Sequence, residues 1–177
     1  MRKGQLLSQP FFYIFAIVVI GLILIFGFFY VNKILKTGCE VEGLDFINDA
    51  QAKVNEINAL SFGSSFECSL VRSGGSSNRR CELVIPENIN GVCFIDTTKS
   101  FNENDILFSD IKELVVGLGS SANRNLFFSL NENSNCKTEP AMIKKMTTDG
   151  AVCLDVKKGN QNFIMENIGS GVVIKNI

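Results

Sequence analysis

The chain has 177 residues and nearly balanced charge, with 17 Lys and Arg against 18 Asp and Glu, and it contains no histidine and no tryptophan. The lack of histidine excludes a histidine general base, the Ser-His-Asp and Cys-His nucleophile systems, and a histidine-ligated zinc or haem. The length suits one domain of ordinary size.

The charges are divided unevenly along the chain. Residues 1–36 contain Arg2, Lys3, Lys33 and Lys36 and no acid, so the other residues share 13 bases and 18 acids. The larger part of the chain is therefore mildly acidic and has no basic stripe. We expect no nucleic-acid partner for it.

An uninterrupted apolar run follows the short basic head of residues 1–10. Residues 11–31 contain no charge and would extend about 31 Å as a helix, which matches a hydrocarbon core of about 30 Å. Tyr13 and Tyr30 lie near its ends, as in the aromatic belts of membrane spans. A cleaved secretory signal fits less well, because the apolar region of such a signal is shorter than the run of residues 11–31. We predict a transmembrane helix within residues 11–36, in contact with lipid.

The cysteines indicate the orientation of this helix, because the charges that flank it are nearly symmetric. All six follow the apolar run and none forms a CxxC pair, which favours disulfides in an oxidising space over a zinc site or a redox motif. They are Cys39, Cys68, Cys81, Cys93, Cys136 and Cys153. We therefore expect the N-terminus inside the cell membrane and residues 37–177 outside, as one disulfide-stapled domain.

A short motif stands before the apolar run. Arg2-Lys3-Gly4-Gln5 resembles the class III signal peptide of archaeal type IV pilins and archaellins. The resemblance implies that a prepilin-type peptidase recognises the two bases and cuts between Gly4 and Gln5. It also implies that the helix of residues 11–31 packs against identical subunits in a filament.

The chain also departs from the pilin pattern. Gln9 stands where many pilins carry a glutamate, and Pro10 follows at the helix entrance, where proline is tolerated. The apolar run has few small residues and no GxxxG motif. The layout as a whole resembles uncharacterised archaeal single-pass surface proteins, and that resemblance implies no activity.

A second helical pattern begins after the membrane segment. Between Gly43 and Leu60, apolar residues recur at helical spacing. They are Leu44, Ile47, Ala50, Val54 and Ile57. Thr37-Gly38 indicates a break between this helix and the membrane segment.

Short strand-like runs fill most of the remaining chain. They cover residues 66–71, 80–85, 91–97, 125–130, 141–146, 151–156, 161–168 and 171–177. A helix capped by Asn104 or Asp105 and closed by Gly119 lies among them. The predicted fold class is α+β: an N-terminal transmembrane helix followed by a β-rich, antiparallel sandwich-like domain with two helices.

Gly74-Gly75 favours a two-residue hairpin turn between the first two runs. In that antiparallel register Cys68 lies opposite Cys81, within reach of a disulfide. The pairing of these two cysteines is therefore tied to the hairpin.

Four cysteines remain, and four cysteines allow three pairings. Cys93 and Cys153 both lie in apolar strand-like runs, so we prefer a bond between them. That choice leaves Cys39 to pair with Cys136.

The sequence offers no constellation for catalysis, for a cofactor or for a metal. It lacks GxSxG, P-loop, GxGxxG and calcium-loop patterns. Four carboxylates have no spacing that fixes a pair, namely Asp96, Asp105, Asp110 and Glu113. Lys144 and Lys145 fall on a predicted strand, so we expect them to face opposite ways.

The expected function is that of a membrane-anchored structural or adhesive surface protein, a pilin-like subunit rather than an enzyme. The alternative is a monomeric membrane-tethered binding module, or an accessory subunit of a membrane complex. Cleavage between Gly4 and Gln5 separates these possibilities, because only the pilin-like subunit requires it.

Overall fold

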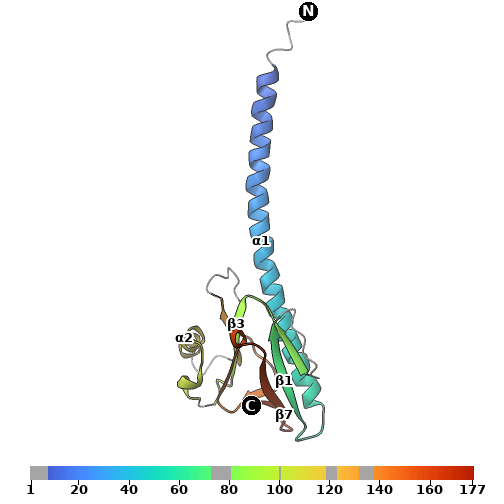
Figure 1. Ribbon diagram of the computed structural model, residues 1–177, viewed down its shortest axis with the longest axis vertical. Helices are drawn as coiled ribbons and strands as arrows, with labels where there is room; N and C mark the ends of the chain where they lie inside the picture. The colour runs from blue at the N-terminus through green and yellow to red at the C-terminus, as the bar shows by residue number, and fades with distance from the viewer. Residues whose placement is uncertain (1–7, 73–80, 100, 119–122, 132–137) are drawn as a thin grey trace, which may run out of the picture. The chain divides into compact units, whose positions relative to one another are not determined.

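The computed structural model describes residues 8–72, 81–99, 101–118, 123–131 and 138–177, with the backbone alone at 8–10, 35, 36 and 39 (Figure 1). The chain divides into two compact units, Met1–Gly38 and Cys39–Ile177. The elements, in chain order, are α1 (Ser8–Asn58), β1 (Ser65–Arg72), β2 (Cys81–Ile85), β3 (Ile89–Ile95), the 3-10 turn η1 (Glu103–Asp105), α2 (Ser109–Leu118), β4 (Leu126–Leu130), β5 (Met146–Thr148), β6 (Ala151–Asp155), the 3-10 turn η2 (Val156–Lys158), β7 (Gln161–Asn167) and β8 (Val172–Asn176).

The first part of α1 is an apolar helix of membrane-spanning length. Phe11–Ile34 is long and apolar enough to cross a membrane, and none of its most apolar window is buried. Large side chains such as Phe12 and Phe29 are more than 70% exposed. The predicted break at Thr37-Gly38 is wrong, because both residues are helical and the Thr37 hydroxyl donates to the Lys33 carbonyl at 3.1 Å. One glycine costs a helix only about 1 kcal/mol, which its neighbours offset.

The second part of α1 packs on the core of the Cys39–Ile177 unit. The buried stripe consists of Phe46, Ala50, Val54 and Ile57. These positions share one helix face, as the 3.6-residue period requires. The sequence placed Leu44 and Ile47 on this stripe, but Leu44 is 58% exposed and Ile47 is only partly buried. Phe46 is the large buried side chain instead, because Leu44 lies nearly opposite it on the helix.

The larger sheet has the strand order β2-β1-β7-β8-β5 and mixed direction. β1 is antiparallel to β7 and β7 to β8, whereas β1 is parallel to β2 and β5 to β8. The predicted hairpin is therefore wrong, although Gly74-Gly75 itself lies outside the described residues. Parallel pairing sets Leu70 beside Leu83, both fully buried, where the hairpin register would set Leu70 beside Arg79.

The smaller sheet is antiparallel, with the order β4-β3-β6. β3 is buried along its whole length, because its two faces belong to two different cores. Val92 and Phe94 face α1 and the larger sheet, whereas Cys93 and Ile95 face α2. The α+β class is confirmed, but the domain combines a mixed sheet with an antiparallel one rather than two antiparallel sheets.

The two preferred disulfides are present. Cys68 and Cys81 are partners in the β1–β2 ladder, with 4.5 Å between their Cα atoms, and they are bonded. Cys93 and Cys153 are partners in the β3–β6 ladder and are also bonded. The expected Cys39–Cys136 pair lies outside the residues whose side chains are described.

The predicted strand over 141–146 is wrong. Ala141 makes a single bridge to Leu126, and the next strand, β5, begins only at Met146. The buried Asn125 amide holds the segment as a loop, since it donates to the Ile143 carbonyl at 2.8 Å and accepts from the Ile143 N–H at 2.7 Å. Lys145 has a positive φ of 62°, which no strand residue adopts, so the two lysines do not alternate across a sheet.

The end of α1 is capped by a side chain from β7. The buried Asn167 donates through Nδ2 to the carbonyls of Ile57, Asn58 and Leu60, at 3.2, 3.2 and 2.8 Å. Its Oδ1 accepts from the Gly169 N–H at 2.8 Å. One amide thereby satisfies helix carbonyls that have no intrahelical partner.

Replacing this amide tests how strongly β7 holds the helix end. Asn167→Ala should lower the free energy of unfolding by about 2 kcal/mol, because buried carbonyls lose their donor. Chemical denaturation of the full chain in detergent measures the change. Asn162→Ala, at an exposed position of the same strand, is the matched control and should stay within about 0.5 kcal/mol of the wild type. An equal loss in both variants would contradict the capping role.

Candidate functional site

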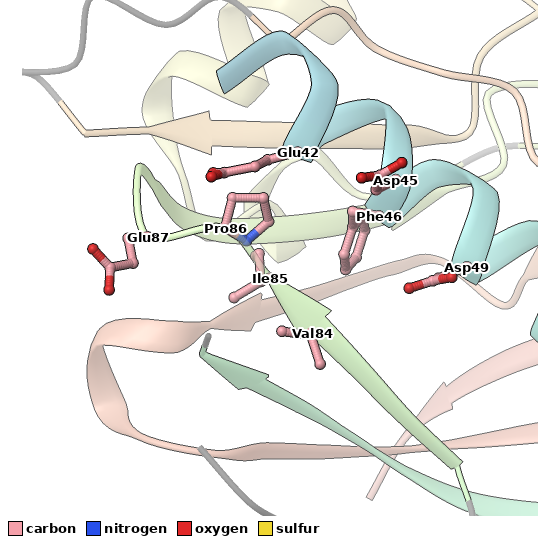
Figure 2. A pocket seen from close by; sticks show the side chains of 8 residues that line it. All are labelled: Glu42, Asp45, Phe46, Asp49, Val84, Ile85, Pro86 and Glu87. Atoms are coloured by element: carbon pink, nitrogen blue, oxygen red, sulfur yellow. The ribbon is translucent and has the colours of Figure 1, made fainter. Parts of the chain in front are cut away.

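An acidic groove of about 440 Å³ runs beside the second part of α1, within the Cys39–Ile177 unit. Figure 2 shows α1 on one side of it and the end of β2 on the other. Its lining residues are Glu42, Asp45, Phe46, Asp49, Val84, Ile85, Pro86 and Glu87. We call this feature the acidic groove.

The acidic groove has an apolar base and a carboxylate rim. Phe46 and Ile85 are almost fully buried, and Pro86 is buried beside them. Three carboxylates project from α1 at a spacing of three and four residues, which places them on one flank of the helix: Glu42, Asp45 and Asp49. Glu87 adds a fourth from the turn that follows β2.

No described basic side chain pairs with the four carboxylates of the acidic groove. None of the eight lining side chains is basic, and no ion pair between described residues includes any of the four acids. In the part of the chain that the structure describes, no group of three or more His, Cys, Asp or Glu side chains is arranged to hold a metal ion. The apolar base and the acidic rim together suit a lysine or arginine side chain. Its methylene groups can cover the apolar surface while its charged group contacts the carboxylates.

A second groove, of about 520 Å³, lies on the other flank of α1. Leu44 and Ile47 line it from the helix, and Ala141 and Met142 line it from the loop that precedes β5. The Gln51 amide fixes this loop to α1, because it accepts from the Lys144 N–H at 2.7 Å and donates to the Lys144 carbonyl at 3.3 Å. This groove is the more apolar of the two, and it combines Glu40, Glu139 and Arg124 at its edge.

Asp96 forms a separate polar network after β3. Its carboxylate accepts from the hydroxyls of Thr98 and Thr147, at 2.5 and 2.7 Å, and from the Thr98 N–H at 3.1 Å, while the Lys99 ammonium lies 3.8 Å away. Burial by itself raises the pKa of Asp96, but these hydrogen bonds and the Lys99 charge outweigh it, so the pKa lies below its usual value. The network joins the turn that follows β3 to Thr147 of β5.

The four carboxylates that the sequence singled out have different surroundings. Asp96 contacts Thr147, whereas Asp110 accepts from the Ser129 hydroxyl at 3.2 Å. Asp105 ends η1 and Glu113 is exposed on α2. No described hydrogen bond or ion pair joins two of the four to a shared partner, and Gly4 and Gln5 lie outside the described residues.

Sequence reasoning missed the acidic groove, although half of its signal is present in the sequence. From Thr37 to Ala52 the chain contains four acids and no base, directly after Lys33 and Lys36. That run identifies an acidic helix flank. The contribution of β2 to the groove has no signal in the sequence, because it depends on the pairing of β1 with β2.

Comparison of the chain with protein-family models, with curated proteins and with solved structures finds no match. The apolar part of α1 and the grooves beside its second part are the features that bear on function.

The Asp96 network predicts an acid-dependent loss of stability. A carboxyl whose pKa is lowered by folding stabilises the protein above its unfolded pKa of about 3.9, and this contribution is lost as the pH falls through the folded pKa. Asp96→Asn should therefore cost about 1 kcal/mol of unfolding free energy at neutral pH and progressively less below about pH 4. Denaturation curves from pH 7 to pH 2.5 measure it.

Asp105→Asn removes one charge at an exposed site and serves as the control. A difference between Asp96→Asn and the wild type that stays constant across the whole pH range would show that the hydrogen bonds to the ionised carboxylate do not stabilise the fold.

Proposed function

We propose that the chain is a membrane-anchored structural subunit of a surface assembly, of the type IV pilin kind, and that its role is structural rather than catalytic. Its outer domain, residues 37–177, lies outside the cell membrane with the N-terminus inside. The helix that begins at Phe11 anchors each copy in the bilayer and then packs against identical helices in the assembly.

The apolar part of α1 is the observation that carries this proposal. Its large side chains are exposed around the whole helix, for example Phe15 at 67%, Ile17 at 70% and Phe26 at 65%. Each such side chain gains about 1.5–3 kcal/mol when it leaves water. Lipid satisfies this surface before assembly, and neighbouring helices satisfy it afterwards.

The same helix also supplies the core of the outer domain, which supports a structural role. A plain anchor needs only apolar length, whereas α1 continues from Phe11–Ile34 into the buried stripe Phe46–Ile57. A contact made by the second part of α1 in an assembly therefore involves the domain directly. The motif Arg2-Lys3-Gly4-Gln5 adds the leader that such a subunit requires.

The disulfides support the location of the outer domain. Cys68–Cys81 and Cys93–Cys153 each join neighbouring strands, and bonds of this kind persist in oxidising compartments. A single N-terminal apolar helix fits a membrane anchor. Together they fit a domain that is tethered at the outer surface of the membrane.

Blocking the leader tests the pilin-like function. Gly4→Val should prevent cleavage after residue 4, so the intact mass should retain residues 1–4 and surface assemblies should disappear, while the outer domain keeps its disulfides. Mass spectrometry of the intact native protein reports the retained leader and the disulfides, and sedimentation of the surface fraction reports the assemblies. Gly117→Ala is the control, because a Cβ at Gly117 meets no atom within 4 Å and the site is far from the leader in sequence. Retention of Met1 in the wild-type protein would instead favour the monomeric binding module or the accessory subunit.

Protease accessibility tests the orientation. Protease added to intact cells should degrade residues 37–177 and leave the first ten residues intact, because the membrane protects only what lies inside. Immunoblots of the uncleaved Gly4→Val variant, with tags at either end, distinguish the two parts, because cleavage after Gly4 would remove an N-terminal tag. Protection of the outer domain until the membrane is opened would reverse the proposed topology.

A further inference from the structure

We infer that the acidic groove of one copy binds the Lys33–Lys36 segment of a neighbouring copy, and that this contact sets the displacement between neighbouring α1 helices. The inference rests on the proposed function, because it requires identical copies to assemble. It names the partner of the acidic groove, which the fold alone leaves open.

The charge sequence of α1 supplies both halves of the contact. Between Lys36 and Lys53, every charged residue is acidic. Those acids are Glu40, Glu42, Asp45 and Asp49, and the last three line the acidic groove. Every copy therefore carries one basic segment and one acidic groove on the same helix.

The groove is built for the chemistry of a lysine. Val84 is 43% exposed and lies beside the buried Phe46 and Ile85, which offers apolar surface to a methylene chain. The carboxylates of Asp45 and Asp49 stand along the helix side of that surface (Figure 2). Since no described ion pair uses these carboxylates, a lysine ammonium from outside gains them without breaking an existing pair.

The spacing of charges along α1 bears on whether Lys33 and Lys36 fill this role in their own copy. On a helix only residues three or four apart face one another. In the sequence, Glu40 is the acid that follows Lys36 at that spacing. Glu42 is six residues from Lys36, and Asp49 is sixteen residues from Lys33. These separations do not match the helical spacing of three or four residues, so we assign the complementary charge to a second copy.

The offset between the two charged segments gives the contact its direction. Copies drawn from one membrane keep their helices parallel in the assembly. Lys33 and Lys36 of one copy meet Glu42–Asp49 of the next when the assembled helices are displaced by roughly six to sixteen residues. Each copy then uses its basic segment on one neighbour and its groove on another. Such a heterologous contact does not close on itself in a pair and builds an open, helical array.

Charge reversal tests the contact with two variants of the full chain. The basic-segment variant is Lys33→Glu with Lys36→Glu, and the groove variant is Asp45→Lys with Asp49→Lys. Each alone should reduce the yield of sedimentable surface assembly at least tenfold, because like charges then meet. Coexpression of the two should restore assembly, since the reversed segment of one variant fits the reversed groove of the other.

Matched controls carry the same change of charge elsewhere in the outer domain. Lys157→Glu with Lys158→Glu matches the basic-segment variant, and Glu103→Lys with Asp105→Lys matches the groove variant, all at exposed positions. Both controls should assemble at wild-type yield. Intact Cys68–Cys81 and Cys93–Cys153 bonds, measured by non-reducing peptide mapping, show that each variant is folded.

The outcomes separate this inference from the proposed function. If the wild type forms no assembly, both fail. If the wild type assembles and the two variants assemble as well as their controls, the groove contact is wrong while the structural subunit stands. If the folded variants fail to assemble and coexpression does not restore them, a contact between the basic segment and the groove is likewise excluded. The contact is supported only if each variant fails to assemble by itself and coexpression of the two restores assembly.

Discussion

The buried stripe of α1 is the contact on which the rest of the outer domain depends. Phe46 packs edge-to-face on Phe128 of the smaller sheet at 5.8 Å, and Val54 is fully buried in the same core. Gln51 binds the loop before β5, and Asn167 caps the helix end. The buried stripe, Gln51 and Asn167 together fix the position of the second part of α1 on the domain. One flank of this helix then forms the acidic groove with β2 and the turn after it, and the other flank forms the second groove with the loop before β5.

The smaller sheet divides the domain into two cores, and each core holds one disulfide. Cys68–Cys81 lies in the core shared with α1, whereas Cys93–Cys153 lies beneath α2. The bonds close loops with sequence separations of 13 and 60, which stabilise the fold by about 3 and 4 kcal/mol on the chain-entropy account. This stabilisation adds to that of the two apolar cores.

The three acids of α1 that line the acidic groove form no described ion pair within the fold. Asp96 accepts hydrogen bonds from Thr98 and Thr147, and Asp155 accepts one within its own turn, yet Glu42, Asp45 and Asp49 line a groove without a described partner. In the proposed assembly, the fold and the contacts between copies use different faces of one helix. The buried stripe holds the domain, and the acidic flank with the preceding lysines carries the charge pattern that we assign to contacts between copies.

The sequence by itself determined the apolar helix, the presence of α2 and seven of the described strands, because these follow from composition, period and local turn residues. It also named the partners of two disulfides, but the hairpin from which Cys68–Cys81 was argued is wrong, since β1 and β2 are parallel. The predicted helix cap at Asn104 or Asp105 is wrong as well, because α2 begins at Ser109. Only the tertiary structure decided the parallel pairing of β1 with β2, the exchange of Leu44 for Phe46 in the buried stripe, and the loop that Asn125 holds at Ile143. The acidic run on α1 was readable, but its groove was not. Each of these features depends on which distant segment a residue meets, and a one-dimensional pattern of polar and apolar residues leaves that choice open.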